Sequence, residues 1–571
     1  MKSVMSPATH TGMIINHARF HVAIKKNYKH MKRITYYCAY FLVFGLLFSS
    51  CKTQKPISPQ SRPTTPSTQG PKETSSTPEK VLPKIPVALQ PMNYQMPEMP
   101  REFRGVWIAT VANIDWPISG TDSYEKQKRD FLAILDYYKG LNFNAVIVQI
   151  RTAGDAFYPS NFAPWSKYLT GKQGKAPGTT DNPLTWMIKE SHARGLEFHA
   201  WLNPYRATMT LQTDDLSPEH DFNAHRNWML KYDTKWYYNP GLPEVKAHLL
   251  SVIKEVVDNY DIDAIHFDDY FYPYKVAKTV FPDKATYDKY KKPGQSQDDW
   301  RRQNVNELIF ALNQTIKSSK PWVQFGISPF GVWRNQDKDP KGSPTRAGQT
   351  NYDDLYADVI LWMKNGWIDY LIPQIYWSME HPLASHRKLN DWWSNNANRT
   401  NVYVGNGPYK IREDSDKAWE NPREINTQIS YTRTLQQIQG NAFFSAKSMM
   451  MKNKDVAQLL KSELYNEPTL PPAFQPKTPS IIDIPKVLEV KANDQVTQIN
   501  LEKPLDPAIR YGMIQGANEL SGLADAEIHP VWVGGSRART LEVSSLNTRY
   551  ISVRWIDHFG RIVQTQVYQI P

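Results

Sequence analysis

Short apolar runs alternate with longer stretches of helix-like spacing from residue 101 to about residue 468. Runs of four to eight apolar residues predict buried strands, and apolar residues three or four apart predict helices. A strand followed by a helix or loop segment, repeated eight times, is the pattern of a (β/α)8 TIM barrel. We expect its strands at residues 104–111, 144–150, 197–203, 264–268, 324–329, 370–376, 401–405 and 441–446.

The segments between these strands have apolar spacing typical of helices, which supports an α/β fold class. An open doubly wound sheet is the alternative arrangement. No glycine-rich phosphate turn follows the first strand, which disfavours that alternative. The expected helices lie at residues 124–141, 182–194, 243–260, 300–319, 352–365 and 421–439.

A second pattern begins after a proline-rich linker at residues 468–483. Short strand-like runs follow at the spacing of a β-sandwich, at residues 487–490, 498–501, 511–515, 529–533, 540–543, 550–555 and 562–569. We therefore predict a barrel domain at residues 99–467 and a small all-β domain of the immunoglobulin or fibronectin type at residues 484–571. We expect this second domain to serve packing or spacing rather than catalysis.

The amino-terminal part has the features of an export signal. Residues 31–51 have a basic start, an apolar run and small residues before Cys51, so residues 1–50 are predicted to be a signal segment with its true start at Met31. This segment resembles a bacterial lipoprotein signal, which implies cleavage before Cys51 and a lipid on its thiol. An uncleaved membrane anchor is the alternative. Residues 51–98 are rich in proline, serine and threonine and are predicted to form an extended tether.

Charge and cysteine content exclude several kinds of function. The formal net charge is +12, but residues 1–50 hold seven Lys or Arg and no acid, so the remainder carries 12 − 7 = +5. This mild excess predicts no nucleic-acid binding. Cys38 and Cys51 are the two cysteines, so we expect no disulfide. His199 and His266 lack ligand spacing, so we expect buried hydrogen-bonding histidines, with no metal and no cofactor; a metal-dependent hydrolase is a distant alternative.

The segment at residues 263–274, Asp-Ala-Ile-His-Phe-Asp-Asp-Tyr-Phe-Tyr-Pro-Tyr, is a predicted strand that runs into two adjacent carboxylates. Active sites of parallel barrels lie at the carboxyl ends of the strands. Strand alternation places Asp268 on the inward face and turns Asp269 elsewhere unless the strand has ended. We expect Asp268 to be the first catalytic carboxylate, with Asp269 beside it orienting Arg206 or a loop.

Glycoside hydrolysis generally needs a second carboxylic group. Glu380 lies beyond the sixth predicted strand and is expected to reach over the barrel mouth as the acid. Asp115 and Asp155, after the first and second strands, are its rivals. For all three residues the alternative is an ordinary solvated loop acid.

Aromatic and planar polar residues gather near the predicted strand ends, and sixteen of the eighteen tryptophans lie in the barrel domain. Sugars stack their C–H faces on aromatic rings and bind planar polar groups through their hydroxyls, although core packing is the alternative for any single tryptophan. Alternation places Gln149 with Arg151, Trp201 with Asn203, and Gln374 with Tyr376 on the inward face. The predicted substrate-binding residues are Trp107, Asp115, Trp116, Gln149, Arg151, Trp201, Asn203, Tyr205, Arg206, Tyr270, Gln374, Tyr376 and Trp377.

Several motifs occur together: Arg-Glu-Phe-Arg-Gly-Val-Trp from residue 101, Gln-Ile-Arg from 149, Trp-Leu-Asn-Pro-Tyr-Arg from 201, His-Phe-Asp-Asp-Tyr from 266 and Pro-Gln-Ile-Tyr-Trp from 373. In this order, across residues 101–466, they resemble the glycosyl-hydrolase-like 10 family of bacterial lipoproteins. The resemblance implies a barrel glycosidase in the cell envelope, and one branch is similar to enzymes that cut peptide-free peptidoglycan strands.

The chain departs from two better-known barrel glycosidase patterns. Its seventh strand continues Val-Gly-Asn-Gly-Pro-Tyr without a carboxylate, and Tyr270 stands where the chitinase pattern has its catalytic glutamate. We expect a glycoside hydrolase whose partners are a glycan and, through Cys51, a membrane. A non-catalytic glycan-binding envelope lipoprotein is the alternative.

Overall fold

The computed structural model describes residues 89–474 and 481–570. The predicted signal segment, Cys51 and the tether up to residue 88 lie outside these described residues. Among the helices of the described ranges, none is long and apolar enough to cross a membrane. The described part therefore comprises the predicted barrel, the carboxyl-terminal domain and the end of the predicted tether.

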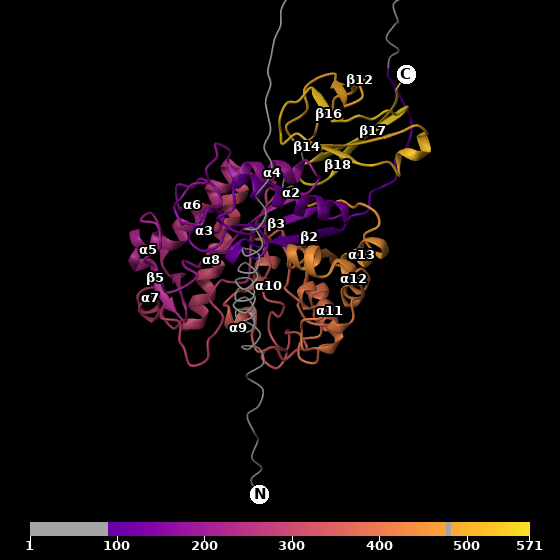
Figure 1. Ribbon diagram of the computed structural model, residues 1–571. Coiled ribbons are helices and arrows are strands. Elements are labelled where there is room, and N and C mark those ends of the chain that lie inside the picture. Colours follow the sequence, from indigo (N-terminus) through magenta and orange to yellow (C-terminus); the bar gives the residue numbers. More distant parts are fainter. Residues whose placement is uncertain (1–88, 475–480, 571) are drawn as a thin grey trace, which may run out of the picture. The chain divides into compact units, whose positions relative to one another are not determined.

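Eight parallel strands close into a barrel, in the order β10-β11-β2-β3-β4-β7-β8-β9 (Figure 1). The predicted TIM barrel is confirmed, and each observed strand overlaps a predicted one. The strands are β2 (Phe103–Ile108), β3 (Ala145–Arg151), β4 (Glu197–Leu202), β7 (Ala264–Phe267), β8 (Gln324–Ile327), β9 (Tyr370–Leu371), β10 (Asn401–Asn406) and β11 (Ile438–Phe443).

Helices follow the strands, and local sequence sets where they begin. Helix α2 begins after Ser123, whose side chain caps the Lys126 N–H, and α4 begins with Asn182 as its cap and Pro183 in its first turn. The helices are α2 (Tyr124–Gly140), α3 (Lys167–Thr170), α4 (Pro183–His192), α5 (Asp221–Ala224), α6 (Pro243–Asn259), α7 (Lys284–Tyr290), α8 (Gln297–Ser319), α9 (Asn351–Asp354), α10 (Val359–Lys364), α11 (His386–Asn396), α12 (Glu424–Thr432) and α13 (Lys454–Glu463). A hairpin of β5 (Met229–Tyr232) and β6 (Lys235–Tyr238) lies between α5 and α6.

The barrel interior is filled by side chains, with Tyr370 near its centre. Gly326 on β8 leaves the room for this ring, because a Cβ at that position would overlap it. The Tyr370 hydroxyl lies 2.8 Å from His199 Nδ1 and 3.0 Å from His266 Nδ1. Both histidines are fully buried, so the structure places them as hydrogen-bonding core groups below the mouth.

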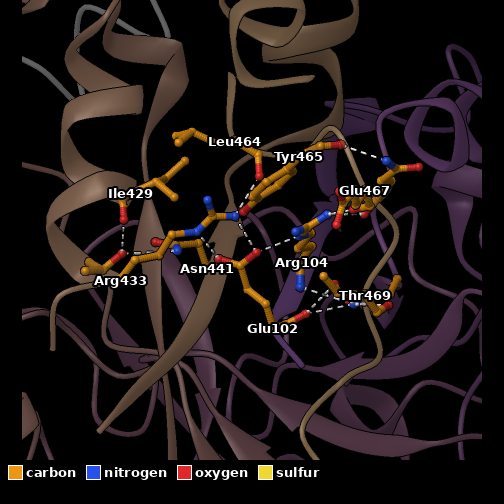
Figure 2. A network of polar contacts seen from close by, with 12 residues as sticks. Glu102, Arg104, Ile429, Arg433, Asn441, Leu464, Tyr465, Glu467 and Thr469 are labelled. Atoms are coloured by element: carbon orange, nitrogen blue, oxygen red, sulfur yellow. Dashed lines mark hydrogen bonds and ion pairs between the residues drawn. The ribbon is translucent and has the colours of Figure 1, made fainter. Parts of the chain in front are cut away.

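A network of charged and aromatic residues connects the start of β2 to the segments that follow α12 and α13, as Figure 2 shows. The Glu102 carboxylate accepts hydrogen bonds from Arg104 and, at 2.8 Å, from both Nε and Nη2 of Arg433. The Arg104 guanidinium lies 4.0 Å from the centre of the Tyr465 ring. Segments more than 300 residues apart in the sequence are thereby held together where the barrel closes.

The carboxyl-terminal domain consists of two antiparallel sheets, drawn in yellow in Figure 1. Its sheets have the orders β1-β18-β17-β14-β15 and β12-β13-β16. The strands are β12 (Val487–Ala492), β13 (Val496–Leu501), β14 (Ile509–Ala517), β15 (His529–Trp532), β16 (Thr540–Ser544), β17 (Tyr550–Asp557) and β18 (Ile562–Gln569). All seven were predicted from the sequence pattern.

The first sheet also contains a strand that the sequence pattern did not predict. Strand β1 (Gln90–Pro91) pairs with β18, and Arg554 Nη2 donates to the Pro97 carbonyl. Met96 is buried against Leu523 and Val567. The end of the predicted tether therefore belongs to the folded part of the chain.

A buried ion pair joins this domain to the start of β7. Both Asp263, directly before β7, and Arg510, on β14, are almost fully buried. Arg510 Nη2 lies 2.7 Å from Asp263 Oδ1, and the other carboxylate oxygen accepts from the Phe198 N–H and pairs with His192. Burial alone would raise the pKa of Asp263, but Arg510 and His192 overcome this effect and hold the pKa well below its usual range.

Candidate active site

Asp268 and Asp269 occupy the turn that follows β7. The strand ends at Phe267, so alternation no longer separates the two side chains. Both carboxyl groups are buried at the carboxyl end of the barrel. Burial, followed by the negative charge of Asp268, raises the pKa of Asp269, so the charge of one group affects the ionisation of the other.

A relay of amide groups fixes the environment of Asp268. The Thr110 and Val111 N–H groups both donate to Gln149 Oε1, so the Gln149 amide nitrogen donates, at 2.6 Å, to Asn203 Oδ1. The Asn203 amide nitrogen in turn donates to Asp268 Oδ2. Because each amide orientation determines the next, Asn203 is set as a donor to the carboxylate.

Further groups favour the ionised form of Asp268. Its other oxygen accepts from the Tyr270 N–H at 3.3 Å. Burial raises the pKa of Asp268, while the positive charge of Arg206, the Tyr270 N–H and the Asn203 amide oppose that rise. The Arg206 guanidinium is itself held by the Thr152 carbonyl, at 3.0 Å, and lies over the Tyr270 ring.

Asp269 lies in a different environment from Asp268. Its carboxyl group accepts a hydrogen bond from the Tyr274 hydroxyl, and the Gln374 amide is a second polar partner. Burial, followed by the negative charge of Asp268, raises the pKa of Asp269 to about 7, against the effect of these two partners. At neutral pH the pair therefore has one favoured arrangement, with Asp268 ionised and Asp269 able to hold a proton.

Three half-buried aromatic residues stand at the ends of β9, β10 and β11. The Tyr376 ring centre lies 6.1 Å from that of Phe444 and 6.0 Å from that of Tyr409. Trp107, on the inner face of β2, lies 6.3 Å from Phe444. We call Tyr376, Tyr409 and Phe444 the aromatic wall.

The predicted proton donor Glu380 lies at the surface. Its side chain is 66% exposed, and one carboxylate oxygen pairs at 2.6 Å with Arg387 in the first turn of α11. This position corrects the expectation that Glu380 reaches over the mouth. The loop after β9 contributes Gln374 and Tyr376 to the site instead.

Arg151 does not point into the barrel, so its predicted inward placement is wrong. A β-bulge shifts the register, so that Gln149 pairs with Trp201 on β4 but Arg151 pairs with Leu202. Arg151 Nη2 lies 3.3 Å from the Tyr238 hydroxyl, in the layer between the strands and the helices. The extra residue of the bulge turns the side chain outward, which period-two alternation does not anticipate.

Four further predicted site residues make contacts within the fold. They do not stand free at the mouth of the barrel. Trp116 is buried, donating to the Gln127 carbonyl of α2, and Tyr205 is buried in the layer outside the strands. Burial raises the pKa of Asp115 to about 6, although its oxygens accept from the Ala109 N–H, the Ser445 hydroxyl and the Lys447 N–H. Asp155 accepts from the Thr152 and Ala153 N–H groups of its own turn.

Several of the other candidates lie beside the carboxylate pair. Trp201 is on the inner face of β4 beside Asp268, and Tyr270 directly follows the pair. Trp377 is half-buried and contacts Phe330 edge to face, with ring centres 5.5 Å apart. The inward placements predicted for Gln149, Asn203 and Gln374 agree with their contacts in the structure.

Sequence reasoning missed Tyr274, Tyr409 and Phe444. Tyr274 closes the aromatic segment at residues 263–274, and its hydroxyl reaches back to Asp269. Tyr409 and Phe444 come shortly after the seventh and eighth strands. Active sites of barrels lie at the carboxyl ends of the strands. Applying this rule to the aromatic residues that follow each predicted strand would have identified all three.

The sequence of the barrel domain matches a known protein family. The model of the family described as glycosyl hydrolase-like 10 matches residues 102–421, more than half of the chain. The chain belongs to this glycosyl hydrolase-like family. The matched range includes the two aspartates, the amide relay and the strands that position them.

Named relatives extend this family assignment. A protein named glycosyl hydrolase YngK, from Bacillus subtilis, is 48% identical over 409 residues, which cover 70% of this chain and 79% of that protein. Glycosyl hydrolase DigH from Escherichia coli K12 is 38% identical over 359 residues, covering 60% of this chain and 80% of that protein. The family member described here is accordingly an enzyme of the glycoside hydrolase class.

Among solved structures, the glycoside hydrolase domain of PgaB from Bordetella bronchiseptica matches with a TM-score of 0.42 and 13% sequence identity. The match covers 63% of this chain and 98% of that domain.

Proposed function

We propose that this glycoside hydrolase cleaves a polysaccharide of the bacterial cell envelope, with peptide-free peptidoglycan glycan strands as its substrate. The observation that carries the proposal is the buried pair Asp268–Asp269, in which one carboxyl group is surrounded by donors and the other has a raised pKa. The resemblance of the sequence to a family branch that acts on such strands supports the choice of substrate.

In this proposal Asp269 is the general acid. A proton donor for a glycosidic oxygen needs a pKa close to the working pH, and burial beside Asp268 provides one of about 7 for Asp269. The Tyr274 hydroxyl and the Gln374 amide hold this carboxyl group in place.

Asp268 is the ionised partner. The bond to the departing sugar breaks with positive charge developing at the anomeric carbon, and a fixed carboxylate nearby stabilises that charge. Asn203 and the Tyr270 N–H hold Asp268 in place without neutralising it. The aromatic wall offers flat apolar surface to the C–H face of a sugar.

Purified residues 89–571 incubated with peptidoglycan strands stripped of peptides should release shorter sugars. We expect Asp268→Asn to lower the rate by at least about 100-fold, because it removes the fixed charge that the transition state needs. Glu380→Gln, a matched change of an exposed carboxylate, should leave the rate within about twofold. Chromatography of the products measures both rates, and an unchanged rate in Asp268→Asn would remove that residue from the mechanism.

We also propose that the chain is an exported lipoprotein of the cell envelope, anchored through Cys51. The short basic start, the apolar run and the small residues before Cys51 support this proposal. Cells grown with labelled palmitate should label the wild-type chain but not Cys51→Ala. A wild-type chain without label would contradict the anchor.

A further inference from the structure

The side of the barrel facing the carboxylate pair is aromatic. Strands β7 and β11 are four strands apart in both directions around the closed barrel, so they lie opposite each other. Asp268 and Asp269 follow β7, whereas Phe444 follows β11 and Tyr409 follows β10. A sugar bound against Asp268 and Asp269 therefore has the aromatic wall on the side facing away from these carboxyl groups.

The carboxylates nearest to this wall already have partners. Asp115, after β2, accepts from the Ala109 N–H of its own loop with one oxygen, and with the other from Ser445 and Lys447 in the loop that follows Phe444. In the loop after β10, Asp414 pairs with Lys410, and Asp416 accepts from Ser378. These acids serve loop structure, which, within residues 89–474 and 481–570, leaves the two adjacent aspartates as the acids of the site.

Adjacent residues at one strand end cannot flank a sugar from both sides. A protein nucleophile or a water-activating base needs a carboxyl group across the anomeric carbon from the acid, about 5 Å or 6.5–9.5 Å away, respectively. Asp268 and Asp269 both follow the last residue of β7, Phe267, and are joined by a single peptide bond. The attack on the anomeric carbon must then come from another group.

We propose that the substrate supplies this group, as a 2-acylamino substituent on the sugar whose bond is cut. Its carbonyl oxygen bonds to C1 while the bond from C1 to the glycosidic oxygen breaks, and the proton of Asp269 moves to that departing oxygen. The Asp268 carboxylate accepts the amide N–H and balances the positive charge of the five-membered ring that forms.

Water completes the reaction. It adds to C1 and gives a proton to Asp269, while the bond from the carbonyl oxygen to C1 breaks and the amide is restored. Two displacements at C1 leave its configuration retained. This inference rests on the proposed glycan hydrolysis and adds to it the origin of the nucleophile.

The two halves of the site fit the two ends of an acylamino group. The N–H needs an ionised acceptor, which Asn203 and Arg206 maintain at Asp268. The acyl methyl needs an apolar contact, and Tyr376 borders both the carboxylates and Phe444. Tyr376 is therefore placed to pack against the acyl group as the carbonyl oxygen turns toward C1.

The thiazoline analogue of N-acetylglucosamine, a stable mimic of the five-membered ring, tests the inference. We expect the wild-type enzyme to bind it at least about 100-fold more tightly than N-acetylglucosamine, because it resembles the state that the site stabilises. Asp268→Asn should lose at least about tenfold of that affinity, while Glu380→Gln should keep it. Equal affinity of the wild type for both compounds would overturn the inference.

Product stereochemistry gives a second readout on the wild-type enzyme, so the test does not depend on a variant that folds. Proton NMR during cleavage should show the retained anomer, and intact-mass measurement with a 2-fluoro glycoside should show no sugar attached to the protein. An inverted product, or a sugar bound to Asp115 or Asp268, would overturn the inference but leave the proposed hydrolysis standing. Absence of cleavage of any glycan would instead contradict the proposed function.

Discussion

At the scale of single residues, two chemically identical side chains receive different roles from their neighbours. Asp268 accepts from Asn203 and from a backbone N–H and lies near Arg206, all of which favour the ionised form. Asp269 has one tyrosine hydroxyl and one amide as partners, with Asp268 as a negative neighbour. Environment alone thus separates an acid from a carboxylate.

This difference predicts a pH profile. Asp269 must carry its proton to act, so kcat/KM should fall about tenfold per pH unit above the apparent pKa of about 7. A second fall is expected at low pH, where Asp268 becomes protonated. Initial rates between pH 4 and pH 9 measure the profile, and a rate that stays constant up to pH 9 would contradict Asp269 as the acid.

Residue placement in the site could be predicted from the sequence only where regular strand geometry holds. Alternation correctly placed Gln149, which precedes the bulge of β3, and Asn203, which directly follows β4. It failed at Arg151, because a bulge has no clear sequence signal, and it could not place Asp269, because the strand ends one residue earlier than Asp268. Glu380 lies in a loop, whose path follows from tertiary contacts such as the pair with Arg387.

At the scale of secondary-structure elements, β7 is held at both ends. Its carboxyl end carries the two aspartates, and its amino end is held by Asp263, which pairs with Arg510 of the carboxyl-terminal domain. His192 stacks on Trp532 of the same domain, with ring centres 3.8 Å apart. The strand that presents the carboxylates is therefore fixed by contacts from outside the barrel.

Breaking the pair between Asp263 and Arg510 should destabilise the fold. Arg510→Met leaves the buried Asp263 carboxylate without its arginine partner, so we expect a loss of about 3–5 kcal/mol in the free energy of unfolding at pH 7. The low pKa of Asp263 stabilises the fold above the unfolded-state pKa of about 4, and this contribution is lost as pH falls below it. The difference between wild type and variant should accordingly narrow on acidification.

Urea unfolding followed by tryptophan fluorescence measures this difference. Arg387→Met, which breaks the exposed pair with Glu380, is the matched control and should change the stability by less than about 1 kcal/mol. An equally small change in Arg510→Met would contradict a stabilising role for the buried pair.

At the scale of the whole molecule, the barrel and the carboxyl-terminal sheets follow from hydrophobic periodicity. All eight barrel strands and seven carboxyl-terminal strands were predicted because each has a strong local pattern. The attachment of residues 90–91 to β18 was not predicted, since it joins parts of the chain nearly 480 residues apart. The Arg433–Glu102 contact joins residues 331 positions apart and likewise gives no local signal.

The arrangement of the molecule brings its chemistry to one end of the barrel. The amide relay, the carboxylate pair and the aromatic wall all follow the carboxyl ends of strands. The opposite strand ends carry ion pairs, namely Glu102 with Arg433 and Asp263 with Arg510. The division agrees with the general rule that barrel enzymes catalyse at one face and are stabilised at the other.

In the proposed mechanism Asp269 donates the proton, and the Asp268 carboxylate stabilises the positive charge that develops at the anomeric carbon. Glycosides with a dinitrophenol leaving group test it most directly, because that group departs without protonation. On this substrate Asp269→Asn should retain a kcat/KM within about tenfold of wild type, because kcat/KM reports the departure of the leaving group. On an ordinary glycan the same variant should lose about 100-fold or more. Asp268→Asn should lose activity on both. Equal losses by the two variants on the activated substrate would contradict this division of roles.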